Sequence, residues 1–305
     1  MKAFLGSEAV AEGTISRHRL GRCRRIYPDV YLPADRPAPA LCDRIGGAWL
    51  WSRRRGVIAG VAASAVHGAR WVDDDAVVEM LLRNGRPPIG VIARNEMVAD
   101  DELTFVGRLP VTTPARTAFD LARHLPRGQS VARLDALTRA TPFEVERVLM
   151  LAQRYPGARG LRQLRELLPL VDGGAASPKE SWLRLLLIDA GFPVPTTQIP
   201  VHINQRLFAM LDMGWEEFRV ATEYDGDQHR TDRREYVRGE RRQRTLPQLG
   251  WLNIKVIAED RADDVIRRVH GALRSRGWCG ELTPRLRRCG RFPTFSGVAA
   301  ISGGR

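Results

Sequence analysis

Residues 207–229 decide the fold of the C-terminal part of the chain, and they read LFAMLDMGWEEFRVATEYDGDQH. Two apolar runs, Leu207–Gly214 and Phe218–Tyr224, are separated by the polar pair at 216–217, which predicts two strands and a turn. A third run, Gln198–Ile203, precedes them across another short turn. Strands joined by short turns pair antiparallel, so we expect a three-stranded meander.

Carboxylates gather at the end of this predicted meander. Side chains alternate along a strand, which places Glu223 and Asp225 on the same side. Asp212 on the preceding strand lies across from Glu223 if the register allows it. Crowded carboxylates repel one another unless a cation neutralises them, and hard oxygen ligands suit Mg²⁺ or Mn²⁺. We therefore predict a metal site at Asp212, Glu223 and Asp225, with His229 moving protons.

Each of these acids also has a structural interpretation. Asp212 could be a surface acid near a turn, and the stretch from Glu223 to Asp225 could be a strand end that enters a turn. Ser177-Pro178-Lys179-Glu180 predicts the start of a helix, in which Glu180 closes a capping box. Glu180 is therefore either a site acid or only a cap.

A basic helix is predicted directly after the acids. Residues 228–244 hold seven arginines and three acids. Such a helix can bind a phosphate backbone without reading bases. The candidate nucleic-acid contacts are Arg230, Arg234, Arg238, Arg241 and Arg242. An apolar strand at 252–257 and an amphipathic helix at 260–274 follow.

Bulk composition favours a polyanionic partner. The net charge is +13 and the pI is about 10.6, and cationic side chains release counterions when they bind phosphates. Four scattered cysteines form no C-x-x-C pair, which argues against a zinc ribbon or a disulfide framework. With neither a membrane-length apolar run nor a secretory signal, we expect a cytoplasmic protein that lies outside the membrane.

Composition divides the chain into four parts. Residues 1–36 carry two short predicted helices, at 7–11 and 16–24, followed by an alternating apolar run. They form a small winged-helix-like segment or an arm that packs on the next domain. Residues 40–170 are a mixed α/β middle domain, residues 176–275 contain the predicted site, and residues 276–305 are a basic flexible tail.

Ser177–Arg274 resembles the DUF559 domain, a relative of the very-short-patch repair endonuclease in the PD-(D/E)XK superfamily. The resemblance is carried by the SPKE stretch at 177, by LD at 211, by EYDGDQH at 223 and by LGW at 249. It implies a restriction-endonuclease-like α/β/α core with a mixed sheet, a Mg²⁺-type site and cleavage of DNA. It also implies that Asp212 and Glu223 bind the metal and that Glu180 is the helix acid of the site.

One position departs from the superfamily pattern. Asp225 stands where a lysine is usual, two residues after the second acid. The repair endonuclease also lacks that lysine and uses a nearby histidine, so His229 is a candidate substitute, and Lys255 is another. The departure bears on cleavage more than on metal binding.

The N-terminal part resembles type IV abortive-infection antitoxins. The resemblance rests on Arg17–Leu20, on the run Ile26–Tyr31 and on Ala59–Gly68. It implies that the N-terminal part is a winged-helix segment with a DNA-binding or regulatory role. Two functions follow: a metal-dependent DNA endonuclease in repair or phage defence, or a catalytically silent DNA-binding antitoxin or transcriptional regulator. We expect DNA as partner and no small-molecule cofactor, while a homodimer and a toxin partner both stay open.

Overall fold

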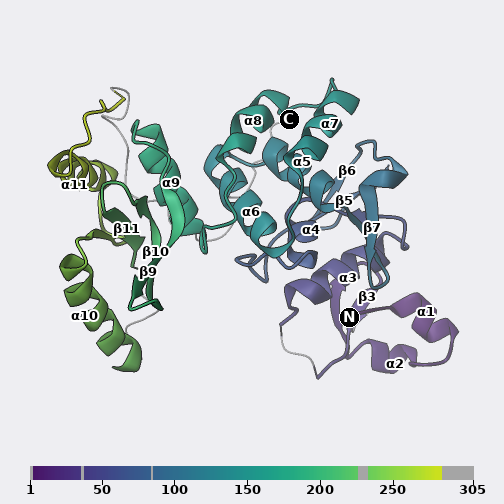
Figure 1. Ribbon diagram of the computed structural model, residues 1–305. Coiled ribbons are helices and arrows are strands. Elements are labelled where there is room, and N and C mark those ends of the chain that lie inside the picture. The colour runs from purple at the N-terminus through teal and green to yellow at the C-terminus, as the bar shows by residue number, and fades with distance from the viewer. Residues whose placement is uncertain (1–2, 36–37, 84, 226–232, 284–305) are drawn as a thin grey trace. The chain divides into compact units, whose positions relative to one another are not determined.

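The computed structural model describes residues 3–35, 38–83, 85–225 and 233–283. Contacts divide the chain at Val171 and Asp172 into two compact units, and each is described by itself (Figure 1). In the described residues, no helix is long and apolar enough to span a membrane.

The first unit begins with a small sheet of the order β1-β3-β2. Its elements are β1 (Phe4–Leu5), α1 (Gly6–Ala11), α2 (Arg17–Leu20), β2 (Arg24–Tyr27) and β3 (Val30–Leu32). Ser16 caps α2 as predicted, accepting a hydrogen bond from the backbone N–H of Arg19. The prediction that this helix reaches Arg24 is wrong, because α2 ends at Leu20 and Arg24 already pairs with Leu32 in the sheet.

A five-stranded mixed sheet of the order β6-β5-β4-β8-β7 follows in the first unit. The elements are α3 (Leu41–Trp51), β4 (Val57–Ile58), α4 (Gly60–Val66), β5 (Val78–Leu81), β6 (Val91–Arg94), η1 (Asp100–Glu102), β7 (Leu103–Val106) and β8 (Leu109–Thr112). Val57 and Ile58 form a short strand because they pair with β5, and helix α4 begins only at Gly60. One core cluster joins Tyr27 and Val30 of the small sheet to Ile45 of α3 and Met80 of β5. The N-terminal segment therefore shares its core with the middle domain.

Four helices complete the first unit: α5 (Pro114–His124), α6 (Arg127–Ala140), α7 (Val145–Arg154) and α8 (Leu161–Leu167), with the short turn η2 (Leu168–Leu170). Thr113 caps α5 through its hydroxyl, and Pro114 occupies the first turn. The helices enclose an apolar cluster that includes Phe119 and Leu134.

A buried ionic cluster links these helices to the sheet. The guanidinium of Arg116, 1% exposed, donates to the carboxylates of Glu102 and Asp120. Arg123 donates to Asp120 at 3.0 Å and to Glu96 at 2.6 Å. Charges this deeply buried are tolerated only with partners, so the cluster fixes how η1 and α5 lie against each other.

The second unit is built on a four-stranded sheet of the order β12-β11-β10-β9. Its elements are α9 (Pro178–Asp189), β9 (Thr196–Ile203), β10 (Arg206–Trp215), β11 (Val220–Tyr224), α10 (Arg233–Gln248), β12 (Leu252–Val256) and α11 (Ala262–Ser275). The predicted antiparallel meander of β9, β10 and β11 is confirmed. Strand β12 pairs parallel to β11 after the crossover through α10, so the sheet is mixed.

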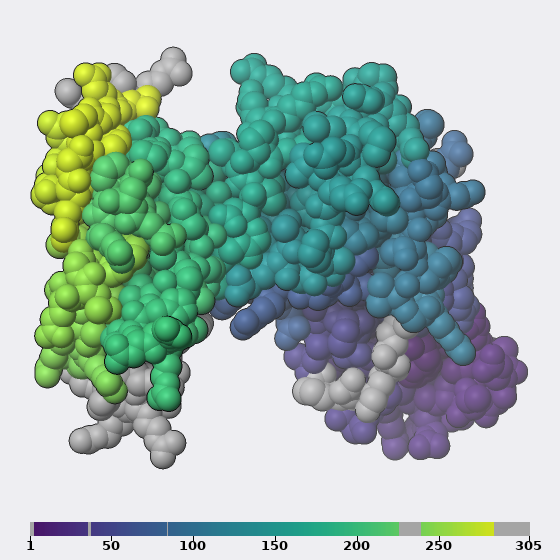
Figure 2. Space-filling model, in the orientation of Figure 1, coloured from purple at the N-terminus to yellow at the C-terminus, as the bar shows by residue number. Residues whose placement is uncertain are grey.

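Helices contribute to two separate cores in this unit. Val220 belongs to the cluster made with α9 and α11, and the next residue, Ala221, belongs to the cluster that contains Leu246 of α10. Because neighbouring side chains of a strand point to opposite faces, the sheet is covered by helices on both sides. At the surface, α10 lies beside the β9–β10 hairpin (Figure 2).

We expect Arg116→Leu to destabilise the first unit by about 3–5 kcal/mol, because the cluster loses a buried positive charge and Glu102 and Asp120 each lose one of two cationic partners. Denaturant unfolding followed by circular dichroism measures the loss. Arg162→Leu is the matched control, because the Arg162 side chain is 94% exposed beside Glu166, and its loss should stay within about 0.5 kcal/mol. Equal effects of the two substitutions would contradict a stabilising role of the buried cluster.

Candidate functional site

The register of three strands brings the predicted acids together. Between β10 and β11 the pairs run from Trp215↔Val220 to Met213↔Thr222, and the next step of the same register places Asp212 opposite Glu223. Between β11 and β12, Glu223 pairs with Lys255. Partners in register project from the same face of a sheet, so these three side chains form one row.

The acids line a pocket of about 710 Å³ at this end of the sheet. Asp212, Glu223 and Asp225 all border it. The lining also includes Phe208, Tyr224, Arg241, Arg242, Asn253 and Lys255. The pocket therefore combines carboxylates from the sheet with arginines from α10, the combination that the sequence predicts for a phosphate-binding metal site.

Asp212 also organises the end of the strand pair. Its Oδ2 accepts a hydrogen bond of 2.9 Å from the backbone N–H of Tyr224. Burial raises the pKa of Asp212 to about 7, aided by the negative charges of Glu180 and Glu223 and opposed by this hydrogen bond and by Arg242. A carboxyl with this pKa binds a proton or a cation readily near neutral pH.

Glu223 is the most enclosed of the pocket acids, with 8% of its surface exposed. Arg242 donates to Oε1, and the side-chain amide of Asn253 donates to Oε2 at 2.5 Å. Asp225 is exposed and forms an ion pair of 3.5 Å with Lys255. Both acids thus have cationic partners from other elements.

Glu180 caps α9. Its backbone N–H donates to the Ser177 hydroxyl at 3.2 Å, and its carboxylate accepts from Ser177 at 2.9 Å and from the Ala176 N–H at 2.8 Å. The capping interpretation is confirmed. Glu180 also raises the pKa of Asp212 through its charge, after the larger effect of burial.

The remaining predicted residues divide into two groups. His229 and Arg230 lie outside the described residues, and of Arg234 and Arg238 only the backbone, within α10, is described. Arg241 and Arg242 both border the pocket. The sequence analysis did not single out Asn253, because only the parallel register of β12 brings it beside Glu223.

The donor set fits a hard divalent cation. Carboxylate oxygens from Asp212, Glu223 and Asp225 border one pocket. The Oδ1 of Asn253 is buried and has no hydrogen-bond partner within the described residues. A buried oxygen left without a donor beside a carboxylate is a suitable ligand for Mg²⁺ or Mn²⁺.

A second carboxylate cluster lies in the first unit. Ligand atoms of Glu96, Asp120 and His124 lie within 4.8 Å of one another. Arg123 already donates to both acids. Burial acts to raise the pKa of Glu96, but His124 and Arg123 outweigh it and lower that pKa to about 2. The Arg123 guanidinium thus occupies the position that a metal ion would need, and we assign this cluster a structural role.

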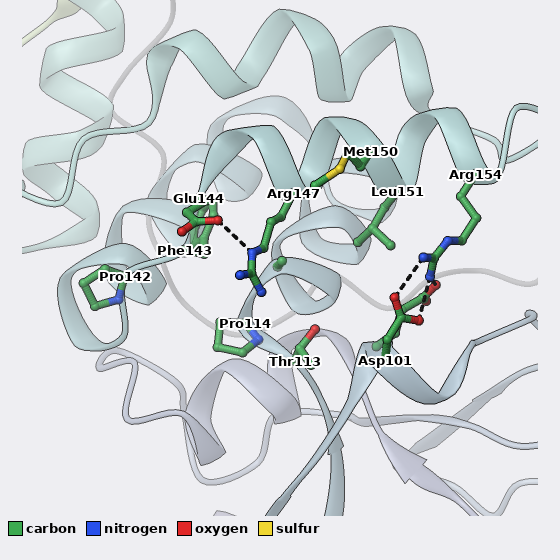
Figure 3. A pocket seen from close by; sticks show the side chains of 12 residues that line it. Asp101, Thr113, Pro114, Pro142, Phe143, Glu144, Arg147, Met150, Leu151 and Arg154 are labelled. Atoms are coloured by element: carbon green, nitrogen blue, oxygen red, sulfur yellow. Dashed lines mark hydrogen bonds and ion pairs between the residues drawn. The ribbon is translucent and has the colours of Figure 1, made fainter.

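The first unit also contains a pocket of about 550 Å³ between η1, the start of α5 and α7 (Figure 3). Arg154 reaches Asp101 at 2.8 Å, and Arg147 pairs with Glu144 at 2.7 Å. Because these charged side chains neutralise one another, the pocket offers no free charge to a ligand, and we assign it no chemistry.

We expect Asp212→Asn to stabilise the metal-free protein increasingly as the pH rises. The folded state holds the Asp212 proton up to about pH 7, whereas the unfolded chain releases it near 3.8. The cost of ionising Asp212 therefore grows between these values and is constant above them, reaching at most about 4 kcal/mol. Thermal unfolding near about pH 5 and about pH 8 measures it, and a variant effect independent of pH would contradict the raised pKa.

Comparisons with known proteins place the chain among its relatives. Residues 55–170 match the family model of the AbiEi antitoxin C-terminal domain. The chain is 30% identical over 255 residues to "Uncharacterized protein MT2308" of Mycobacterium tuberculosis strain CDC 1551 / Oshkosh, covering 83% of this chain and 90% of the relative. The same values hold for "Uncharacterized protein Rv2248" of strain ATCC 25618 / H37Rv. No solved structure matches significantly. The chain belongs to the family of these mycobacterial proteins and contains an AbiEi antitoxin-like domain.

Proposed function

We propose that the second unit is a divalent-cation-dependent nuclease domain that hydrolyses phosphodiester bonds of DNA. The observation that carries this proposal is the row formed by Asp212 and Glu223 on neighbouring strands, at a pocket bordered by Arg241 and Arg242. Acids can hold a cation that activates water and polarises a phosphate, and arginines can bind that phosphate, which together suit metal-assisted phosphodiester hydrolysis.

We assign separate roles to the residues of the pocket and to His229, which lies outside the described residues. Asp212, Glu223 and Asp225 would hold Mg²⁺ or Mn²⁺, and Asn253 would add a neutral oxygen. The bound cation supplies Lewis-acid polarisation of a phosphate oxygen and lowers the pKa of water. Arg241 orients the phosphate backbone, and His229 moves a proton. Lys255, which pairs with Asp225, adds positive charge beside the phosphate.

The order of elements supports a restriction-endonuclease-like core. Helix α9 precedes the antiparallel strands β9–β11, and the α10 crossover leads to the parallel strand β12. Helices cover both faces of the sheet. The expected α/β/α layering and the resemblance to the DUF559 domain favour the same proposal.

Nicking of supercoiled plasmid with Mg²⁺ or Mn²⁺ tests the nuclease proposal. Asp212→Ala and Glu223→Ala should each lower the nicking rate at least about 100-fold, because the cation loses a charged ligand. Glu216→Ala is the control, since Glu216 is an exposed acid at the other end of the same strand pair, and it should keep the rate. If all three variants nick like the unaltered protein, the site is wrongly assigned.

The antitoxin-like domain favours a second candidate, a DNA-binding antitoxin or regulator that keeps the nuclease fold without turnover. The match over 55–170 implies a role in a type IV toxin–antitoxin or abortive-infection system, with a toxin as partner. A basic surface in the first unit supports DNA binding: Arg17, His18, Arg19, Arg22, Arg24 and Arg25 are all exposed. Tight binding without nicking would favour this candidate.

Arg24→Gln combined with Arg25→Gln should weaken DNA binding and its dependence on salt. Each lost phosphate contact lowers the slope of log K against log salt by about 0.9, so the pair should lower it by up to about 2. Fluorescence anisotropy with a labelled duplex at several salt concentrations measures both quantities. An unchanged slope would show that this surface does not contact the DNA backbone.

A further inference from the structure

Arg242 forms an ion pair with Glu223, one of the carboxylates of the proposed metal site. Its Nη2 donates to Glu223 Oε1 and to the backbone oxygen of Met210. The Arg242 side chain is 32% exposed, whereas that of Glu223 is 10% exposed. The arginine comes from α10, is the more exposed of the two side chains, and holds the carboxylate oxygen at the border of the pocket.

Both carboxylate oxygens of Glu223 accept a hydrogen bond while Arg242 is in place. Asn253 donates to Oε2, and Arg242 takes Oε1. A guanidinium and a divalent cation at the same oxygen would repel each other strongly in a half-buried pocket. A cation that binds Glu223 therefore competes with Arg242 for the negative charge of this carboxylate.

The contact that Arg242 makes with the acid is incomplete. One nitrogen serves both acceptors, and Nε is buried without a hydrogen-bond partner in the described part of the chain. A buried donor without an acceptor costs free energy. A phosphate can accept from two guanidinium nitrogens at once, which makes it a better partner than the present one.

A phosphate bound by Arg241 would lie on the side of the pocket where Arg242 is found. Arg241, the preceding residue, is exposed and borders the same pocket, and no ion pair of Arg241 with a described residue is present. A nucleic-acid backbone bound along this end of α10 therefore comes within reach of Arg242.

We propose that Arg242 exchanges partners: it closes the carboxylate site in the free protein and moves to a backbone phosphate when nucleic acid binds. The exchange frees Glu223 for the divalent cation, so nucleic acid and cation bind cooperatively. This inference rests on the proposed function, since it takes Glu223 as a metal ligand. Linkage requires each ligand to raise the affinity of the other by the same factor.

The test measures Mn²⁺ affinity of the full chain by calorimetry or electron paramagnetic resonance. Arg242→Gln should bind Mn²⁺ about tenfold more tightly than the unaltered protein, because its neutral side chain no longer competes for Glu223. Arg244→Gln removes the same charge from the same helix at an 80% exposed side chain that pairs with Glu240, and its Mn²⁺ affinity should change less than about threefold. If the Mn²⁺ affinity rose equally in the two variants, the loss of any positive charge on α10 would explain the gain, and the proposed exchange would be wrong.

A second measurement uses a short DNA duplex with non-hydrolysable linkages. The duplex should raise the Mn²⁺ affinity of the unaltered protein about tenfold, and Mn²⁺ should raise duplex affinity by the same factor. In Arg242→Gln this coupling should disappear, and in Arg244→Gln it should persist. If Mn²⁺ binding depends on Asp212 but the duplex does not change the Mn²⁺ affinity, the proposed exchange is wrong and the proposed metal site still stands. If neither the unaltered protein nor Arg242→Gln binds Mn²⁺, the assignment of the metal site is wrong, and the proposed function is wrong with it.

Discussion

The double pairing of strand β11 is the constraint on which the candidate site depends. Strand β11 runs antiparallel to β10 and parallel to β12. The first pairing places Asp212 beside Glu223, and the second places Asn253 and Lys255 on the other flank. A shift of one residue in either register would turn one set of side chains to the opposite face of the sheet. The chemistry of the pocket thus follows from strand pairing rather than from a flexible loop.

The protein uses arginine–carboxylate pairs in two ways. In the first unit, Arg116 is 1% exposed between Glu102 and Asp120, and removing it would take one of two cationic partners from each of these buried carboxylates. In the second unit, Arg242 is 32% exposed and holds Glu223 through a single nitrogen. The buried pairs fix the architecture, whereas the half-exposed pair can exchange partners because solvent and ligands reach it.

Each of the two units carries features on which one of the two proposed functions rests. The first carries the antitoxin-like domain and an exposed basic segment. The second combines acids with an arginine-bearing helix at one pocket. The excess of basic over acidic residues, which gives a net charge of +13, suits both proposed functions, because backbone contacts do not depend on whether the bound DNA is cleaved.

The sequence alone determined the local elements of the site. The capping box at Ser177 and Glu180, the antiparallel meander and the acids at its end follow from spacing and alternation, which are local properties. It could not determine that 57–58 is a strand or that α2 stops at Leu20, because partners distant in the sequence decide both. Nor could it show that Asn253 and Arg242 hold Glu223. These contacts join elements separated by a crossover, and only tertiary packing fixes their register.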